Sequence, residues 1–302
     1  MDRTVDVNGY ERFSDLNDGR RKREIYLFFC MTFGITWGLA AFALLAPGLV
    51  ASIGGELSPS HPVYLLAVYT PSLSALTLTA SLSGWIGIRA WGARLVKWRV
   101  SPAYWLLLLA GWLVLDFIAR VVASQLDGTP VSDTLLAGIV PTPLHQWYLA
   151  PLFMLGSLAL DAGPLGEEPG WRGYALPRML RGAQGPAQTA IVLGVVWGVW
   201  HLPAFFIAGT FQHDQSMGIF WLILGTTLSS MIMTWLYLRT NESVLVAGIL
   251  VHLMNNSAAA PLWATDLVLL LPACVAGWSL YKSRPGPIKD DAYSGAATRT
   301  PG

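Results

Sequence analysis

The sequence predicts an all-α membrane protein, a polytopic bundle of about eight transmembrane helices with both termini in the cytoplasm. Of its 302 residues, 54% are hydrophobic and only 12% are charged, whereas a soluble domain carries about 25% charged residues. Apolar runs of about 20 residues, enough to cross a bilayer, recur along the chain. Basic residues gather in alternate connecting segments, which is the pattern that orients helices in a membrane.

The apolar runs define the expected helices in order. We expect spanning helices at about 25–47, 62–88, 103–121, 156–178, 186–208, 217–238, 243–260 and 262–281. The run 134–155 is broken by prolines, and a short outer or partly embedded helix is expected near 134–153. The helix after it, about 154–178, is rich in small residues and carries acids, so we expect it to be buried among other helices.

The placement of lysine and arginine gives the expected topology. Basic residues occur at 20–23, 89–99, 178–181, 239 and 282–289. The loops between these groups carry none. Arg120, an exception to the alternation, can pair with Asp116 one turn earlier. Cytoplasmic loops carry the excess of basic residues, so both termini are expected there. Arginine greatly outnumbers lysine, which hints at a GC-rich genome, and we expect a multi-pass protein of the bacterial plasma membrane.

One membrane domain with polar ends is expected. Residues 1–24 and 282–302 are polar and are predicted to be disordered cytoplasmic segments. The transmembrane bundle occupies 25–281, and the residues with chemistry lie at about 155–260. The net charge is +1 and no basic stripe occurs, which argues against a nucleic-acid partner. The partner that the composition implies is the lipid bilayer.

An unusual concentration of charge lies inside one expected membrane helix, in the stretch GEEPGWRGY from Gly166 to Tyr174. A charge in the bilayer interior costs several kcal/mol, so such residues are usually paired and usually functional. Glu168 and Arg172 are four residues apart and can neutralise each other. Glu167 points about 100° away from that pair and has no partner in its own helix. The alternative is a structural Glu–Arg clamp at the membrane edge, with Glu167 as a spare acid among the lipid headgroups.

Two other expected membrane helices contribute polar side chains. His201 follows Trp197 by one turn in an apolar helix, and His252 and Asn256 lie one turn apart on one face of another. At about 1.5 Å of rise per residue, Glu167 lies about 16 Å, His252 about 15 Å and His201 about 22 Å from the cytoplasmic helix ends. Because the three depths agree to within about two turns, we expect one buried polar site.

The residue types in this layer suit water attack on a carbonyl. A carboxylate and an imidazole can share the activation of a water molecule as general base, and a second imidazole with an amide N–H₂ can stabilise an oxyanion. These roles together predict peptide or amide hydrolysis. Glu167, His201 and His252 could instead bind zinc. The helical H-E-x-x-H signature is absent from the sequence, however, so zinc is compatible with the residues but not required.

Three motifs in order resemble those of the CPBP family of intramembrane proteases, also known as Abi or type II CAAX prenyl endopeptidases. The motifs are Glu167-Glu168-x-x-x-Arg172, Trp197-x-x-x-His201 and His252-x-x-x-Asn256. They cover roughly 155–260, about a third of the chain. Each motif alone is weak, but three in order within expected membrane helices are specific. Trp197 stands where the family usually has phenylalanine, and Pro169 is an addition within the first motif.

The resemblance implies a bundle of about eight helices with its site in a cavity within the bilayer. It implies that Glu167 and His201 activate the water, that His252 and Asn256 stabilise the oxyanion, and that Glu168 and Arg172 support them. No cofactor is required on the version of the mechanism that we favour. The implied substrate is a membrane-associated protein or peptide. Bacteria generally lack protein prenylation, so this substrate is expected to differ from prenylated CAAX proteins.

Two other interpretations use the same buried groups. A non-catalytic membrane protein, either a transporter or an immunity protein that binds a partner, could use them as a proton or ligand site. A transporter often has broken helices in two similar halves, and the sequence has one broken helix, near 163–170, and no repeat. Haem ligation by His201 and His252 would leave Glu167 and Asn256 without a role and would give a coloured protein.

Overall fold

A computed structural model gives the structure of the protein. It describes residues 7–131, 144–149, 152, 156, 161–182, 184–214 and 218–283, with side chains from Asp18 onward. Within these ranges six helices are long and apolar enough to cross a membrane. They are α1 (Val7–Leu45), α3 (Pro62–Leu95), α4 (Pro102–Asp127), α8 (Pro186–Trp200, extended by the 3₁₀ turn η3, Leu202–Phe206), α10 (Ile219–Arg239) and α12 (Leu262–Lys282). The predicted all-α membrane bundle is confirmed.

Shorter helices complete the described part of the bundle. They are α2 (Pro47–Gly54), the 3₁₀ turn η1 (Leu144–Leu149), α6 (Ala162–Gly170), η2 (Trp171–Ala175), α7 (Leu176–Leu180), α9 (Phe211–Asp214), η4 (Leu245–Ile249) and α11 (Leu250–Asn256). The expected helices 156–178 and 243–260 correspond to the composites α6–η2–α7 and η4–α11. Most of the expected outer or partly embedded helix, 134–153, lies outside the described residues.

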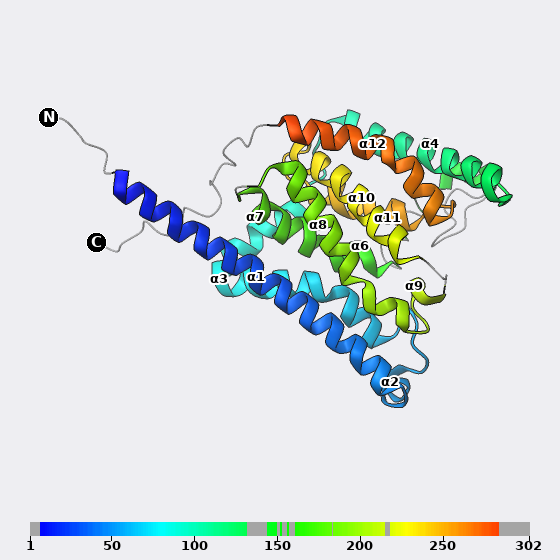
Figure 1. The fold of residues 1–302 in the computed structure, drawn as a ribbon, viewed down its shortest axis with the longest axis horizontal. Helices are drawn as coiled ribbons and strands as arrows, with labels where there is room; N and C mark the ends of the chain where they lie inside the picture. The colour runs from blue at the N-terminus through cyan, green and yellow to red at the C-terminus, as the bar shows by residue number, and fades with distance from the viewer. Residues whose placement is uncertain are drawn as a thin grey trace.

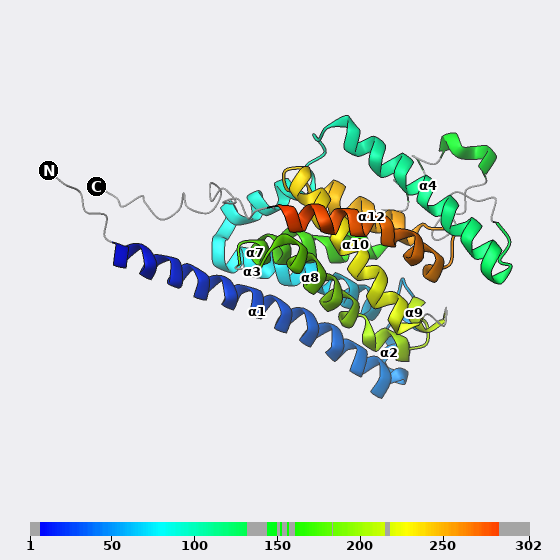
Figure 2. The same cartoon turned by 45° about the horizontal axis from the view of Figure 1, so that its top comes forward.

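The two composite helices lie in the middle of the bundle (Figures 1 and 2). In both views α1 and α4 lie on opposite outer sides, with α6, α8 and α11 between them. The start of α1 and the end of α12 lie at the same end of the molecule. This arrangement fits termini on one side of the membrane, while the assignment of that side to the cytoplasm stays a prediction. The interior location of α6 and α11 agrees with their content of small and polar residues.

The N-terminal segment differs from the prediction, because α1 begins at Val7 and thus includes most of the segment expected to be disordered, residues 1–24. Ion pairs three or four residues apart stabilise its polar first part. These pairs are Asp18–Arg21, Asp18–Lys22 and Arg20–Glu24. The predicted tail 282–302 lies outside the described residues beyond Ser283.

The predicted pairing of Arg120 with Asp116 is present within α4. An Arg120 nitrogen lies 3.2 Å from Asp116 Oδ2, and both side chains are buried. Asp116 Oδ1 also accepts the backbone N–H of Ala259 at 2.9 Å. The acid therefore ties α4 to the segment that follows α11.

The chain of α6 continues into α7 through a π turn instead of breaking. Pro169 has no N–H to donate to the carbonyl of Leu165 four residues earlier, and the Ser72 hydroxyl of α3 donates to that carbonyl at 3.0 Å. Farther along, Leu176 N–H bonds to Trp171 O, five residues back. π turns are rare and often lie at functional sites. Here the turn lets Arg172 and Glu168 stay on one continuous helix, which is buried throughout residues 166–180.

Glycines allow α6 to lie against α3 with almost no space between the two backbones. An ideal Cβ placed on Gly166 would lie 2.8 Å from the carbonyl oxygen of Val68. One placed on Gly170 would lie 2.5 Å from both the carbonyl carbon and oxygen of Pro71. Small residues four apart are a common basis for close helix contacts in membranes. This contact fixes the position of Glu167 and Glu168, which lie between the two glycines.

We expect Gly170→Ala to lower the stability of the protein by about 1–3 kcal/mol, because the new methyl group forces α3 and α6 apart. Thermal unfolding in detergent measures the change. Gly38→Ala is the matched control, since an added Cβ there meets no atom within 4 Å and alanine favours the helix. An unfolding midpoint for Gly170→Ala equal to that of Gly38→Ala would contradict the close contact.

Candidate active site

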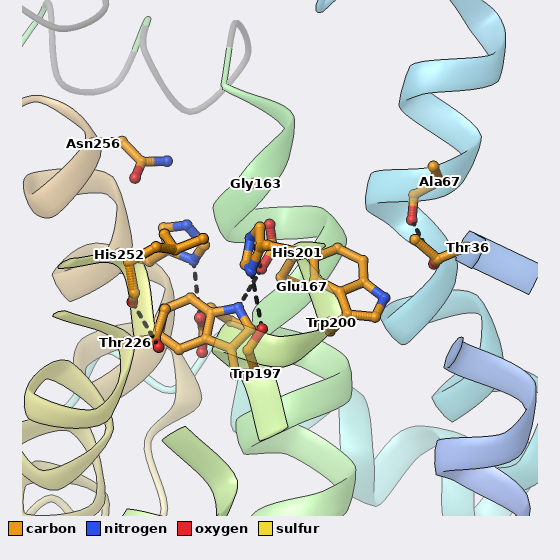
Figure 3. A network of polar contacts seen from close by, with 12 residues as sticks. Thr36, Ala67, Gly163, Glu167, Trp197, Trp200, His201, Thr226, His252 and Asn256 are labelled. Atoms are coloured by element: carbon orange, nitrogen blue, oxygen red, sulfur yellow. Dashed lines mark hydrogen bonds and ion pairs between the residues drawn. The ribbon is translucent and has the colours of Figure 1, made fainter. Parts of the chain in front are cut away.

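Glu167, Trp197 and His201 meet at the junction of α6 and α8 (Figure 3). Glu167 is buried, and its Oε2 accepts a hydrogen bond from Trp197 Nε1 at 2.6 Å. His201 Nε2 lies 3.8 Å from the same carboxylate oxygen. That distance is too long for a direct hydrogen bond. The imidazole and the carboxylate therefore face each other without being bonded.

The other ring nitrogen of His201 fixes which atom faces Glu167. His201 directly follows α8, which ends at Trp200, and the chain turns into η3 because Pro203 cannot continue the α-helical ladder. His201 Nδ1 donates to the Trp197 carbonyl oxygen at 2.9 Å. In the neutral ring the Nε2 atom is then an acceptor. Two hydrogen-bond acceptors, His201 Nε2 and the Glu167 carboxylate, thus face the same gap of 3.8 Å between them.

Glu168, Arg172 and His252 form a second group on the other side of Trp197. Glu168 Oε1 accepts from an Arg172 guanidinium nitrogen at 3.1 Å and from His252 Nδ1 at 2.9 Å. Glu168 and Arg172 have no exposed surface. Gly248, within the π turn η4, allows this proximity, because a Cβ there would lie 2.9 Å from Glu168 Oε2. The expected Glu–Arg pair is therefore deep in the bundle rather than at the membrane edge.

Trp197 joins the two groups. Its indole donates to Glu167, its ring lies 4.3 Å from the Arg172 guanidinium carbon, and its centroid is 5.2 Å from that of His252. Cation–π contact of this kind stabilises a buried guanidinium. In the sequence, Trp197 is notable only as the residue that replaces the phenylalanine usual in the family. The available signal was that tryptophan, unlike phenylalanine, carries an N–H group that can reach a buried acid.

Asn256 lies above His252 and away from Glu167 (Figure 3). Its Nδ2 donates to Asp161 Oδ2 at 2.8 Å. An ideal Cβ on Gly163 would lie 3.1 Å from His252 Nε2 and 3.3 Å from Asn256 Nδ2. Both nitrogens therefore approach the same point of α6. Gly163 precedes Glu167 by four residues, so this point is about 6 Å from Glu167 along the same helix face.

Asp161 is a residue of the site that sequence reasoning did not assign. It directly precedes α6, and its Oδ1 accepts the Gly163 N–H at 3.0 Å. An acid just before a helix is a common N-cap, and this position was the only signal in the sequence. Its contact with Asn256 joins residues 95 apart in the chain, which no local pattern can predict.

An apolar cavity of about 110 Å³ leads to the first group of residues. It lies between α1, α3 and η3, with Glu167 and His201 in its wall. Small residues line much of the rest, among them Ala40, Ala67 and Ala204. We call this the α1–α3 cavity. Among the described residues of its wall, Glu167 is the only charged one, so the reacting groups face a largely apolar lining.

The proposed zinc ligands do not converge. Within the described part of the chain, no three His, Cys, Asp or Glu side chains are close enough together to hold a metal ion. The Nδ1 atoms of His201 and His252 are engaged with Trp197 O and Glu168. The Trp197 ring packs against both imidazoles, with centroid distances of 6.1 and 5.2 Å. No step below is therefore derived through a metal.

The fold and this centre define a helical membrane protein with a buried carboxylate–imidazole site. Residues 146–258, the region that carries the three motifs, match the family model described as type II CAAX prenyl endopeptidase Rce1-like. The resemblance of this region to CPBP proteins is thus confirmed.

Two curated relatives share part of the chain. A protein named CAAX prenyl protease 2 from Methanococcus maripaludis is 32% identical over 93 residues, which is 30% of this chain and 34% of that protein. A protein named ATP synthase subunit a from Solidesulfovibrio magneticus is 32% identical over 162 residues, 51% of this chain and 60% of that protein. The chain thus spans about a third of the length of the first relative and about three fifths of the length of the second.

Proposed function

We propose that the protein is an intramembrane endopeptidase that hydrolyses a peptide bond in a membrane-associated protein or peptide. The observation that carries the proposal is the pair of acceptors, Glu167 Oε2 and His201 Nε2, held 3.8 Å apart beside the α1–α3 cavity. The family of residues 146–258 supports the same class of reaction. A carboxylate and an imidazole are both common general bases, and either can take a proton from an attacking water molecule.

A water molecule fits this pair because it has two protons to donate. One O–H donates to Glu167 and the other to His201 Nε2, which leaves an oxygen lone pair directed at the substrate carbonyl. As the new C–O bond forms, Glu167 takes the water proton, and it returns this proton to the amine when the C–N bond breaks. Trp197 holds the carboxylate in place through its 2.6 Å hydrogen bond.

His252 and Asn256 supply donors for the negative oxygen that develops on the carbonyl. Their Nε2 and Nδ2 atoms approach Gly163, about one helical turn from Glu167. For His252 Nε2 to donate while Nδ1 is bonded to Glu168, the ring must carry both protons. Glu168 provides the negative charge that accompanies such a ring, and Arg172 balances Glu168 in the resting state. Donors placed in this way act mainly on the transition state.

The α1–α3 cavity suits an apolar stretch of the substrate. In the part of the chain that the structure describes, its wall has no charge other than Glu167 that could hold a charged chain end. Small side chains leave room beside the reacting groups, and binding sites in proteins are typically concave and mostly apolar. We therefore propose that the residues next to the cleaved bond are apolar and enter from the α1 and α3 side.

Filling this cavity is expected to reduce cleavage. Ala40→Phe puts a ring into the α1–α3 cavity, and we expect kcat/KM for an apolar reporter peptide to fall at least about tenfold through steric exclusion. Ala41→Phe is the matched control, because Ala41 is exposed on the next position of α1 and does not line the cavity. Equal kcat/KM values for the two variants would contradict this route for the substrate.

Cleavage in water enriched in oxygen-18 tests the reaction class. The full-length protein in lipid vesicles is incubated with apolar membrane peptides, and the products are analysed by mass spectrometry. Hydrolysis puts one heavy oxygen into each new carboxyl group. We expect cleavage to persist when a metal chelator is added. If the chelator abolished cleavage and added zinc restored it, the metal-free mechanism would be wrong. A transporter or a binding protein would leave every peptide intact.

A further inference from the structure

Asp161 holds two elements of the site together through its two carboxylate oxygens. Oδ1 accepts the Gly163 N–H at 3.0 Å and caps α6, the helix that carries Glu167. Oδ2 accepts from Asn256 Nδ2 at 2.8 Å and so holds the last residue of α11. The first motif begins after this residue, so the family resemblance assigned it no part.

The second hydrogen bond decides which end of the Asn256 side chain faces the site. A carboxylate is only an acceptor, so it selects the N–H₂ end of the carboxamide. The same nitrogen is the atom that approaches Gly163 beside His252 Nε2. Asp161 is the one hydrogen-bond partner of this nitrogen among the described residues, so its second N–H can donate to a substrate oxygen. Turned by 180°, the carboxamide would present its own oxygen, which repels an oxyanion.

We propose that Asp161 is a positioning residue that keeps the Asn256 N–H₂ group directed toward the reacting carbonyl. This inference rests on the proposed peptidase function and adds a residue to it. Asp161 acts through Asn256 rather than by touching the substrate. Its effect is therefore expected on the chemical step, since the oxyanion exists only after water has attacked.

Asparagine at this position separates positioning from helix capping. Asp161→Asn keeps a good N-cap, because asparagine caps helices about as well as aspartate. The asparagine side chain has one acceptor, its carbonyl oxygen, and one donor, its N–H₂ group, where aspartate has two acceptor oxygens. With the oxygen engaged by the Gly163 N–H, the new N–H₂ group faces the N–H₂ group of Asn256. The Asn256 carboxamide then gains a hydrogen bond by turning its oxygen to residue 161.

The test measures kcat, KM and the unfolding midpoint of the full-length protein in vesicles, with the best-cleaved reporter peptide. Loss of one oxyanion donor costs about 100-fold to 1,000-fold in kcat, and for the partial reorientation in Asp161→Asn we expect at least about tenfold. KM and the unfolding midpoint are expected to stay unchanged. In an Asn256→Ala background, Asp161→Asn is expected to cause no further loss of kcat, because no carboxamide remains to be turned.

Several outcomes would overturn the inference. A wild-type kcat for Asp161→Asn means that the carboxamide needs no such partner. An equal loss of kcat in the Asn256→Ala background means that Asp161 does not act through the Asn256 carboxamide. Glu167-dependent cleavage combined with either result rejects the role of Asp161 and leaves the peptidase proposal standing. Cleavage that is absent, or that Glu167→Gln does not reduce, rejects the peptidase proposal and this inference with it.

Discussion

Glu167→Gln is expected to lower kcat for peptide cleavage by about 100-fold to 10,000-fold, the usual contribution of a general base. Glutamine has the shape of glutamate and can still accept the hydrogen bond from Trp197 Nε1. It cannot take a proton from the water that His201 Nε2 also holds. The loss is therefore expected in the rate and not in the fold, and single-turnover cleavage with the reporter peptide measures it.

A second buried acid provides the control for that experiment. Asp266 lies on α12, is buried, and lines no part of the α1–α3 cavity. Asp266→Asn makes the same chemical change within the bundle and is expected to keep cleavage within about twofold of the wild type, as a change remote from the reacting groups should. If Glu167→Gln cleaved as fast as Asp266→Asn, Glu167 would not be the base.

Arg172→Leu is expected to lower stability by about 3–5 kcal/mol, the usual result of removing one partner of a buried ion pair. Glu168 has no exposed surface, so it would keep a charge in the interior with only His252 as partner. The contact of Arg172 with the Trp197 ring would also be lost. Thermal unfolding in detergent measures the change.

An exposed pair with the same spacing gives the matched comparison. Arg20 and Glu24 are also four residues apart and bonded at 3.0 Å, but the Arg20 side chain is 64% exposed. Arg20→Leu is expected to change stability by no more than about 0.5 kcal/mol. The double variant Glu168→Gln with Arg172→Leu removes both buried charges and is expected to recover much of the lost stability. Equal effects of Arg172→Leu and Arg20→Leu would contradict the buried clamp.

Much of the fold could be predicted because bilayer thickness sets a length scale that apolar runs reveal directly. The run 219–239, for example, differs from its expectation of 217–238 by a few residues. The composite α6–η2–α7 could not be predicted in detail. The carbonyl that Pro169 leaves unpaired is satisfied by Ser72, which is a contact between distant parts of the chain, and a π turn follows at Trp171–Ala175.

The candidate site was predictable in its members more than in its arrangement. Helical spacing places Glu168 with Arg172 and separates Glu167 from them, as the structure has it. Spacing within one helix cannot give the rotation of one helix relative to another. For that reason the sequence did not show that Trp197 lies between the two groups, or that Asp161 reaches Asn256.

The structure of the Glu167→Gln protein with an uncleaved peptide tests the central claim most directly. The account predicts a water molecule bound between the glutamine side chain of the variant and His201. The carbonyl carbon of the scissile bond is expected within about 4 Å of this water, a distance close to that needed for attack. It also predicts that the carbonyl oxygen faces His252 Nε2 and Asn256 Nδ2, with apolar peptide residues in the α1–α3 cavity. A peptide bound elsewhere, with this cavity empty and those nitrogens out of reach, would contradict the account.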